Sequence, residues 1–136
     1  MGSYVKEYID SKANVPFSWE SNNCLSFVIE YLNGTGFKEL PISWFVGHPD
    51  AKSCYRAYKK HARELRYKDI VEAFDDLLYP EITLYPRDGF VVVKPYGDLI
   101  GYSCGVHYGG YNYFLDELGI TNQEIEPKDL YWSIPA

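Results

Sequence analysis

The stretch SNNCLSFVIEYLNG, residues 21–34, has the pattern of an amphipathic helix that carries a cysteine in its first turn. Asn33-Gly34 provides a stop signal, and Ser21 or Asn22 is the expected N-cap. A thiol at such a position feels the positive end of the helix dipole, which favours the thiolate. Cys24 is therefore a candidate nucleophile, provided that the rest of the chain supplies a base.

Composition limits the class of protein. The chain has 136 residues, of which 46% are hydrophobic and 24% are charged, and these values suit one globular domain with a modest core. No apolar run reaches the roughly 20 residues of a membrane span, and the N-terminal segment lacks the order of a signal peptide. We expect synthesis in the cytoplasm without export. A net charge of −6 argues against nucleic acid as a general partner.

The basic residues are unevenly distributed. Seven of the 13 Lys and Arg residues lie between Lys52 and Lys68. A solvated helical face explains such a cluster, and the alternative is a docking patch for an acidic partner.

The cysteines and histidines show no metal-binding spacing, because no C-x-x-C or H-x-x-x-H pair is present. We expect reduced cysteines, no metal site and no cofactor. These residues are Cys24, Cys54, Cys104, His48, His61 and His107.

The order of the predicted elements indicates the fold class. Helices are expected near Ser3, over 24–34, from Pro49 to about His61, and from about Lys68 to Leu78; strands are expected over 90–93, 99–104, 106–115 and 131–134. Gly105 is a candidate bulge, and Gly109-Gly110 is a candidate bend. The sequence thus predicts a single α+β domain whose N-terminal helices, about residues 1–80, pack on a small C-terminal antiparallel sheet, about residues 81–136.

This order of parts resembles the NlpC-type papain-like cysteine peptidases, and more closely a phage-encoded branch found in tail gene clusters. The resemblance lies in the helix that begins with Cys24, the Asp88-Gly89 pair before an apolar strand, the Pro16-Phe17-Ser18-Trp19 stretch before the cysteine, and the aromatic strand Tyr131-Trp132-Ser133-Ile134. It implies a papain-like fold and a place in the virion, with other virion proteins as partners in a multi-copy assembly.

The catalytic motifs of that family are altered here. Active members usually have D-C-S-G, whereas this chain has Asn23-Cys24-Leu25-Ser26. The family's histidine lies in a pattern similar to H-V-G-I-x-x-G, and the best match, Leu99 to Gly105, puts Leu99 at the histidine position. Leucine cannot accept a proton, and general-base assistance contributes about 10²–10⁴-fold in rate. The resemblance therefore implies a degenerate site.

One alternative keeps an active site. If the strand register shifts at Gly105, His107 would turn toward Cys24, with Asn112 or Tyr113 as its orienting partner. The chain would then be a cell-wall peptidase or amidase, and peptidoglycan would be its substrate.

Tyrosines are abundant in the sheet half, and they suit either packing or an interface. Tyr108, Tyr111 and Tyr113 are the interface candidates. We expect a tail or tail-tip structural component that is catalytically inactive; a small acidic binding protein outside phages is a further alternative.

Overall fold

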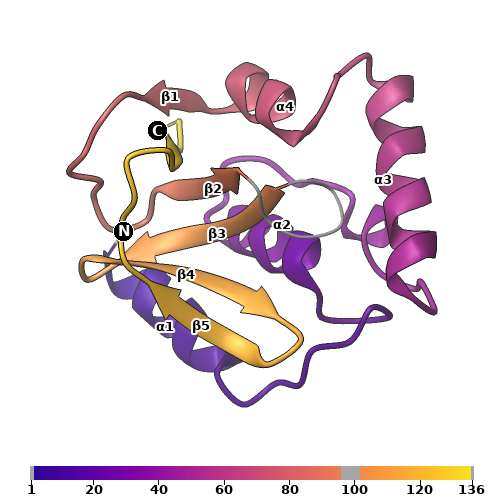
Figure 1. Ribbon diagram of the computed structural model, residues 1–136, viewed down its shortest axis with the longest axis horizontal. Coiled ribbons are helices and arrows are strands. Elements are labelled where there is room, and N and C mark those ends of the chain that lie inside the picture. Colours follow the sequence, from indigo (N-terminus) through magenta and orange to yellow (C-terminus); the bar gives the residue numbers. More distant parts are fainter. Residues whose placement is uncertain (1, 96–101, 136) are drawn as a thin grey trace.

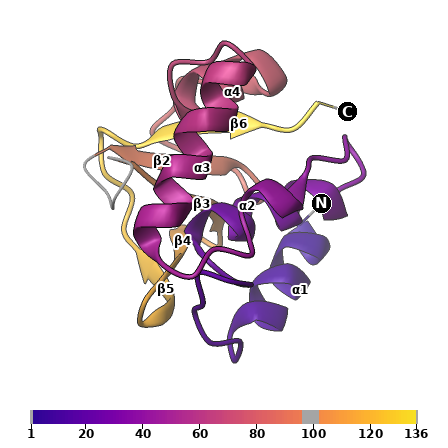
Figure 2. The same cartoon turned by 90° about the vertical axis from the view of Figure 1, so that its right-hand side faces the viewer.

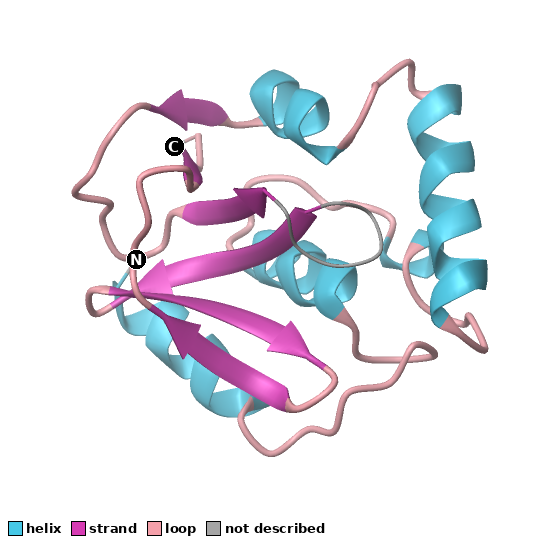
Figure 3. Ribbon diagram, viewed as in Figure 1, coloured by secondary structure: helices cyan, strands magenta, loops and turns pink. Residues whose placement is uncertain are grey.

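The computed structural model describes residues 2–95 and 102–135, and this part of the chain forms a mixed α+β fold with a six-stranded antiparallel sheet (Figures 1 and 3). Four α-helices and one short 3-10 helix occur in it. The helices are α1 (Gly2–Lys12), α2 (Cys24–Gly34), η1 (Ile42–Trp44), α3 (Ala51–Glu64) and α4 (Ile70–Leu77). The strands are β1 (Tyr79–Glu81), β2 (Val91–Pro95), β3 (Tyr102–Tyr108), β4 (Tyr111–Asp116), β5 (Gly119–Gln123) and β6 (Leu130–Ser133).

The strands lie in the order β1-β6-β2-β3-β4-β5, and every neighbouring pair is antiparallel. Helices α1 and α2 cover one face, on which α1 contacts β3 and α2 contacts both β3 and β4 (Figure 2). Helix α3 lies at the side of the molecule in Figure 1, and α4 contacts the edge strand β1.

The main core lies between the sheet and the helices. Val91, Val106 and Trp132 belong to it from the strands, and Phe27 and Tyr31 are the large α2 residues buried there. The Trp132 ring packs edge to face against Phe74 of α4. A smaller cluster, formed by Val92, Phe114 and Tyr131, lies on the opposite face of the sheet, where Phe90 and Ile125 pack against it. Consecutive strand residues alternate between these two clusters, as the pleat of a strand requires.

The N-cap of α2 differs from the prediction. Asn23, instead of Ser21 or Asn22, accepts hydrogen bonds from the backbone N–H groups of Leu25 and Ser26 at 3.0 and 2.9 Å. The Ser26 side chain accepts one from the Asn23 backbone, which completes a capping box. Asn23 also donates to the Phe45 carbonyl at 2.6 Å. The cap residue therefore fixes the helix start and also attaches the loop before α3.

The register of β3 is continuous, so the predicted bulge at Gly105 is wrong. Gly105 pairs with Val92 on one side and with Phe114 on the other. A Cβ atom here would lie 2.1 Å from the Tyr113 carbonyl oxygen, so close packing explains the glycine. The Gly109-Gly110 bend is confirmed: both residues have positive φ, 61° and 88°, and they join β3 to β4.

Two short strands were not predicted. They are β1, which contains Pro80, and β5, which begins at Gly119. Both lie at the edges of the sheet, where pairing with one neighbour decides the conformation. The first three residues of the strand predicted over 99–104, Leu99 among them, lie outside the described residues.

Candidate functional site

Cys24 is the first residue of α2 and lies at the boundary between the core and a surface pocket. Its residue exposure is 8%, and it belongs to the main core cluster. The pocket has a volume of about 310 Å³. Its lining consists of Cys24, Phe17, Trp19, Ser103, Cys104, Phe114, Leu115, Asp116, Glu117, Leu118 and Gln123. We refer to it as the thiol pocket.

The thiol pocket has aromatic walls and an acidic rim. Phe17 and Trp19 pack edge to face, with ring centroids 4.9 Å apart. Asp116 and Glu117, both exposed, lie where β4 turns into β5. All three histidines of the chain are among the described residues, and none of them lines this pocket.

His107 lies in β3 and is 2% exposed. Its neighbour Val106 points into the main core under α2, so His107 points to the opposite face of the sheet. There its ring packs edge to face against Tyr131, with centroids 6.1 Å apart. Because the register of β3 is continuous, the structure does not bring His107 and Cys24 together: the sheet lies between them.

His107 belongs to a buried hydrogen-bond network. Its Nδ1 atom lies 2.8 Å from Oδ1 of Asn112, the residue that it faces in β4. Asn112 Nδ2 donates to the Asp129 carboxylate at 3.1 Å and to the Tyr131 hydroxyl at 2.9 Å. Lys94 Nζ also donates to Asp129, at 3.0 Å. We call these five residues the outer-face network.

The network fixes the orientation of each group. The Asp129 side chain is fully buried and accepts from Lys94, Asn112 and the Glu126 backbone N–H. Since a carboxylate only accepts, Asn112 must direct its NH₂ group toward Asp129 and its oxygen toward His107. The His107 Nδ1 therefore carries a hydrogen and donates it. Lys94 also holds the pKa of Glu126 below its usual value through a hydrogen bond and its charge.

Two members of this network, His107 and Asn112, were candidate residues in the sequence. Asn112 was expected to orient His107 only if the ring turned toward Cys24; the structure pairs the two residues on the opposite face of the sheet. The other candidate, Tyr113, projects to the helix-covered face with Val106. Asp129 and Lys94 were missed, because they come from separate strands or loops and only the sheet order brings them together. Leu99, which aligns with the family's histidine position, lies outside the described residues.

The other two histidines are engaged elsewhere. His48 Nε2 lies 3.1 Å from the Trp44 carbonyl oxygen. His61 Nδ1 lies 3.4 Å from Glu64 Oε2, and the His61 ring stacks on Trp44 with centroids 4.0 Å apart.

The tyrosines expected to form an interface do not form one exposed surface. Tyr108 and Tyr113 are partly buried and pack against the main core, on the face that the helices cover. Tyr111, next to the β3–β4 turn, is 44% exposed. The larger exposed apolar group lies after β1, where Ile82, Leu84 and Tyr85 are 105%, 61% and 87% exposed.

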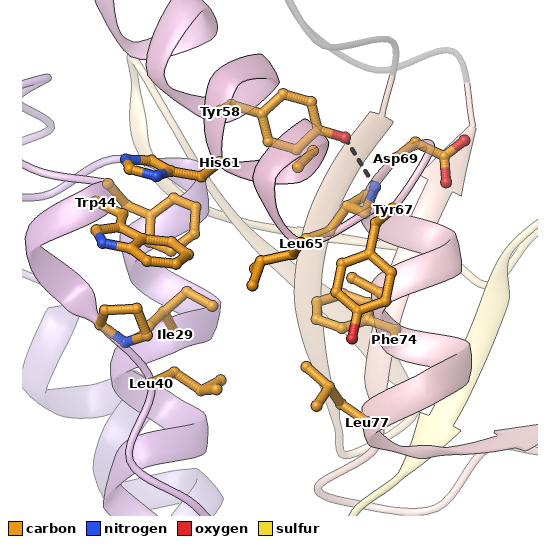
Figure 4. Close-up of a pocket in the computed structure, with 15 residues that line it drawn as sticks. Ile29, Leu40, Trp44, Tyr58, His61, Leu65, Tyr67, Asp69, Phe74 and Leu77 are labelled. Carbon is orange, nitrogen blue, oxygen red and sulfur yellow. Dashed lines mark hydrogen bonds between the residues drawn. The ribbon is translucent and has the colours of Figure 1, made fainter.

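A second pocket is almost wholly apolar and lies among α2, η1, α3 and α4 (Figure 4). Its volume is about 90 Å³. Ile29, Leu40, Leu65 and Leu77 approach it from different elements. The Tyr58 hydroxyl accepts a hydrogen bond from the Ile70 backbone N–H at 2.8 Å, so its polar group is satisfied away from the apolar space. His61, Tyr67 and Asp69 also line this pocket, but the surface that it offers is mainly apolar.

Within residues 2–95 and 102–135, no group of three or more His, Cys, Asp or Glu side chains is arranged to hold a metal ion. Across the same residues, no helix has the length and apolar character needed to cross a membrane. No protein-family model, curated protein sequence or solved structure matches this chain.

Proposed function

We propose that this protein is a non-catalytic assembly component that acts by binding other proteins. In the setting that the sequence resemblance implies, it would be a structural protein of a bacteriophage tail or tail tip, with a papain-like (NlpC-type) arrangement whose catalytic pair has been lost. Its partners would be other virion proteins, and the virion would be its location.

The placement of His107 carries this proposal. In a working cysteine peptidase a base must come within about 2.6–3.2 Å of the thiol proton, directly or through one water. Here the His107 ring lies on the face of the sheet that α2 does not cover, and its Nδ1 is already bonded to Asn112. Turning the ring toward Cys24 would require a one-residue register shift that breaks the pairing of β3 with both β2 and β4.

The surroundings of Cys24 support the same proposal. The cysteine begins a helix that packs on an antiparallel sheet, which is compatible with the papain-like arrangement. The residue itself is part of the core cluster, and buried cysteine behaves as a small hydrophobic side chain. Cys24 is then retained for packing.

Hydrolysis of purified peptidoglycan tests the proposal. The wild-type chain and the Cys24→Ala variant should both leave it intact, and Cys54→Ala, which changes another buried cysteine, serves as the control. In the phage that encodes the chain, Cys24→Ala should leave virion assembly and infectivity unchanged. Release of peptide stems by the wild type that is lost in Cys24→Ala but kept in Cys54→Ala would replace this proposal with the peptidase alternative.

A further inference from the structure

Two separate surfaces of this fold carry opposite charge. Residues 51–68 contain seven of the 13 Lys and Arg residues and only one of the 19 Asp and Glu residues, a net charge of +6 in a chain whose total is −6. All seven basic side chains are exposed, and they form the basic face. They are Lys52, Arg56, Lys59, Lys60, Arg63, Arg66 and Lys68.

The basic face contains a hollow of about 160 Å³ at the C-terminal half of α3. Lys59, Arg63 and Lys68 supply three cations to its lining, and tyrosine rings supply apolar surface. Asp69 also lines it, but its two oxygens accept hydrogen bonds from the Glu72 backbone and the Tyr102 hydroxyl. The hollow therefore suits a segment that presents acidic side chains beside an apolar one. We call it the basic hollow.

The turn between β4 and β5 is a segment of this kind. Asp116 and Glu117 are exposed, and Leu118 is 92% exposed, which is unusual for a large apolar side chain. The Asp116 side chain accepts a hydrogen bond from the Leu118 backbone N–H at 2.8 Å, so the turn has a fixed shape before it meets a partner. We call Asp116–Leu118 the acidic tip. In Figure 1 the acidic tip lies apart from α3, so it does not fill the hollow of its own chain.

We propose that the basic hollow binds the acidic tip of a second copy of this chain. Leu118 enters between the tyrosine rings, and Glu117 approaches Lys59 and Arg63. A contact of this kind joins two different patches, so each copy keeps one unused patch for a further copy unless the two chains pair reciprocally. This deepens the proposed assembly function, on which it rests: it names the surface and the partner.

Charge complementarity selects a second copy as the occupant. Both halves of the contact exist on one chain, and opposite charges on meeting patches give specificity and faster association. The exposed Leu118 supplies the apolar centre that a stable contact needs, while the charges lie around it.

Arg66 belongs to the basic face, outside the lining of the hollow, and has an unusual backbone conformation. It is the only described non-glycine residue with positive φ, 64°, and it follows α3 in a position where glycine is usual. Tyr67 N–H bonds to the Ala62 carbonyl and Arg66 N–H to the Arg63 carbonyl, the pattern of a Schellman motif. The basic face thus keeps a cation at a position that is conformationally unfavourable for it.

Mixing two variants tests the contact. Sedimentation velocity should show that the wild type self-associates with rising concentration, and that high salt weakens the association. Arg63→Glu, which damages the hollow, and Glu117→Lys, which damages the tip, should each weaken self-association about tenfold or more. A mixture of the two variants should associate again, because the intact tip of the first meets the intact hollow of the second.

Controls keep the outcomes distinct. Arg87→Glu and Glu7→Lys make the same charge changes at exposed positions outside both patches, and they should associate as the wild type does. Circular dichroism should report the same fold for every variant. A wild type that stays monomeric, or variants that fail to restore association when mixed, would overturn the inference. The peptidoglycan assay would then still decide the proposed function by itself.

Discussion

Cys24 packs against one face of the six-stranded sheet, and His107 projects from the other. The two residues that the sequence offered as a catalytic pair are thus separated by the strand that carries one of them. This follows from the unbroken register between Tyr102 and Tyr108, because alternation along a strand leaves no freedom for His107 once Val106 points inward. His107 instead has a structural environment, the outer-face network.

The outer-face network should contribute strongly to stability. In Asn112→Leu, His107 and the fully buried Asp129 both lose a partner, and the free energy of unfolding should fall by about 3 kcal/mol. Urea denaturation measures the change. Asn122→Leu makes the same replacement at an exposed position in β5 and should stay within about 0.5 kcal/mol of the wild type. Equal effects of the two changes would contradict the role assigned to the network.

Gly105 should not tolerate a side chain. In Gly105→Ala the new Cβ would lie 2.1 Å from the Tyr113 carbonyl oxygen and 2.7 Å from Phe114 Cδ1, so β4 must move. The expected loss is about 2–3 kcal/mol of unfolding free energy, as for other overpacked sites. Thermal unfolding of the variant measures this loss. Ser103→Ala, a change on the same strand and the same face, is the control. A stable Gly105→Ala protein would show that β3 does bulge here.

Replacing Arg66 by glycine should stabilise the protein. Because its φ is 64°, Arg66→Gly relieves a left-handed conformation and should raise the unfolding free energy by about 0.5–1 kcal/mol. Arg63→Gly makes the same change inside α3, where it should lower stability by about 1 kcal/mol. Chemical denaturation of both variants gives the comparison. If both changes destabilise, the backbone at Arg66 is not strained.

Buried tyrosines should make the fold sensitive to alkali. Burial raises the pKa of Tyr8, Tyr31 and Tyr58 well above the usual 10.0. The unfolded chain releases these protons near pH 10 and the folded chain does not, so stability is constant below pH 10 and falls as the pH rises further. Above pH 10, each such group lowers the free energy of unfolding by about 1.4 kcal/mol per pH unit.

Denaturation at a series of alkaline pH values measures this slope. Tyr31→Phe should reduce it, while Tyr85→Phe, at an 87% exposed position, should not. An unchanged slope in Tyr31→Phe would show that this phenol ionises in the folded protein.

Local patterns predicted the elements better than they predicted the site. The α2 helix and its cysteine follow from apolar spacing within residues 24–34, and that helix has those bounds. Neither β1 nor β5 was predicted, because each is short and depends on a neighbouring strand. The face of the sheet from which His107 projects depends on the register of pairing among β2, β3 and β4. Asp129 lies 17 residues after Asn112 in the chain, and Asn112 links it to His107. Such long-range pairing leaves no periodic signal.

The pH dependence of Cys24 alkylation tests the central claim most directly. The rate of iodoacetamide labelling at Cys24, followed by peptide mass spectrometry, is measured in the wild type, in His107→Gln and in the control His61→Gln. The separation of Cys24 from His107 predicts three superimposable pH profiles. A labelling profile that moves in His107→Gln and stays in place in His61→Gln would show that the imidazole acts on this thiol, and the separation described here would be contradicted.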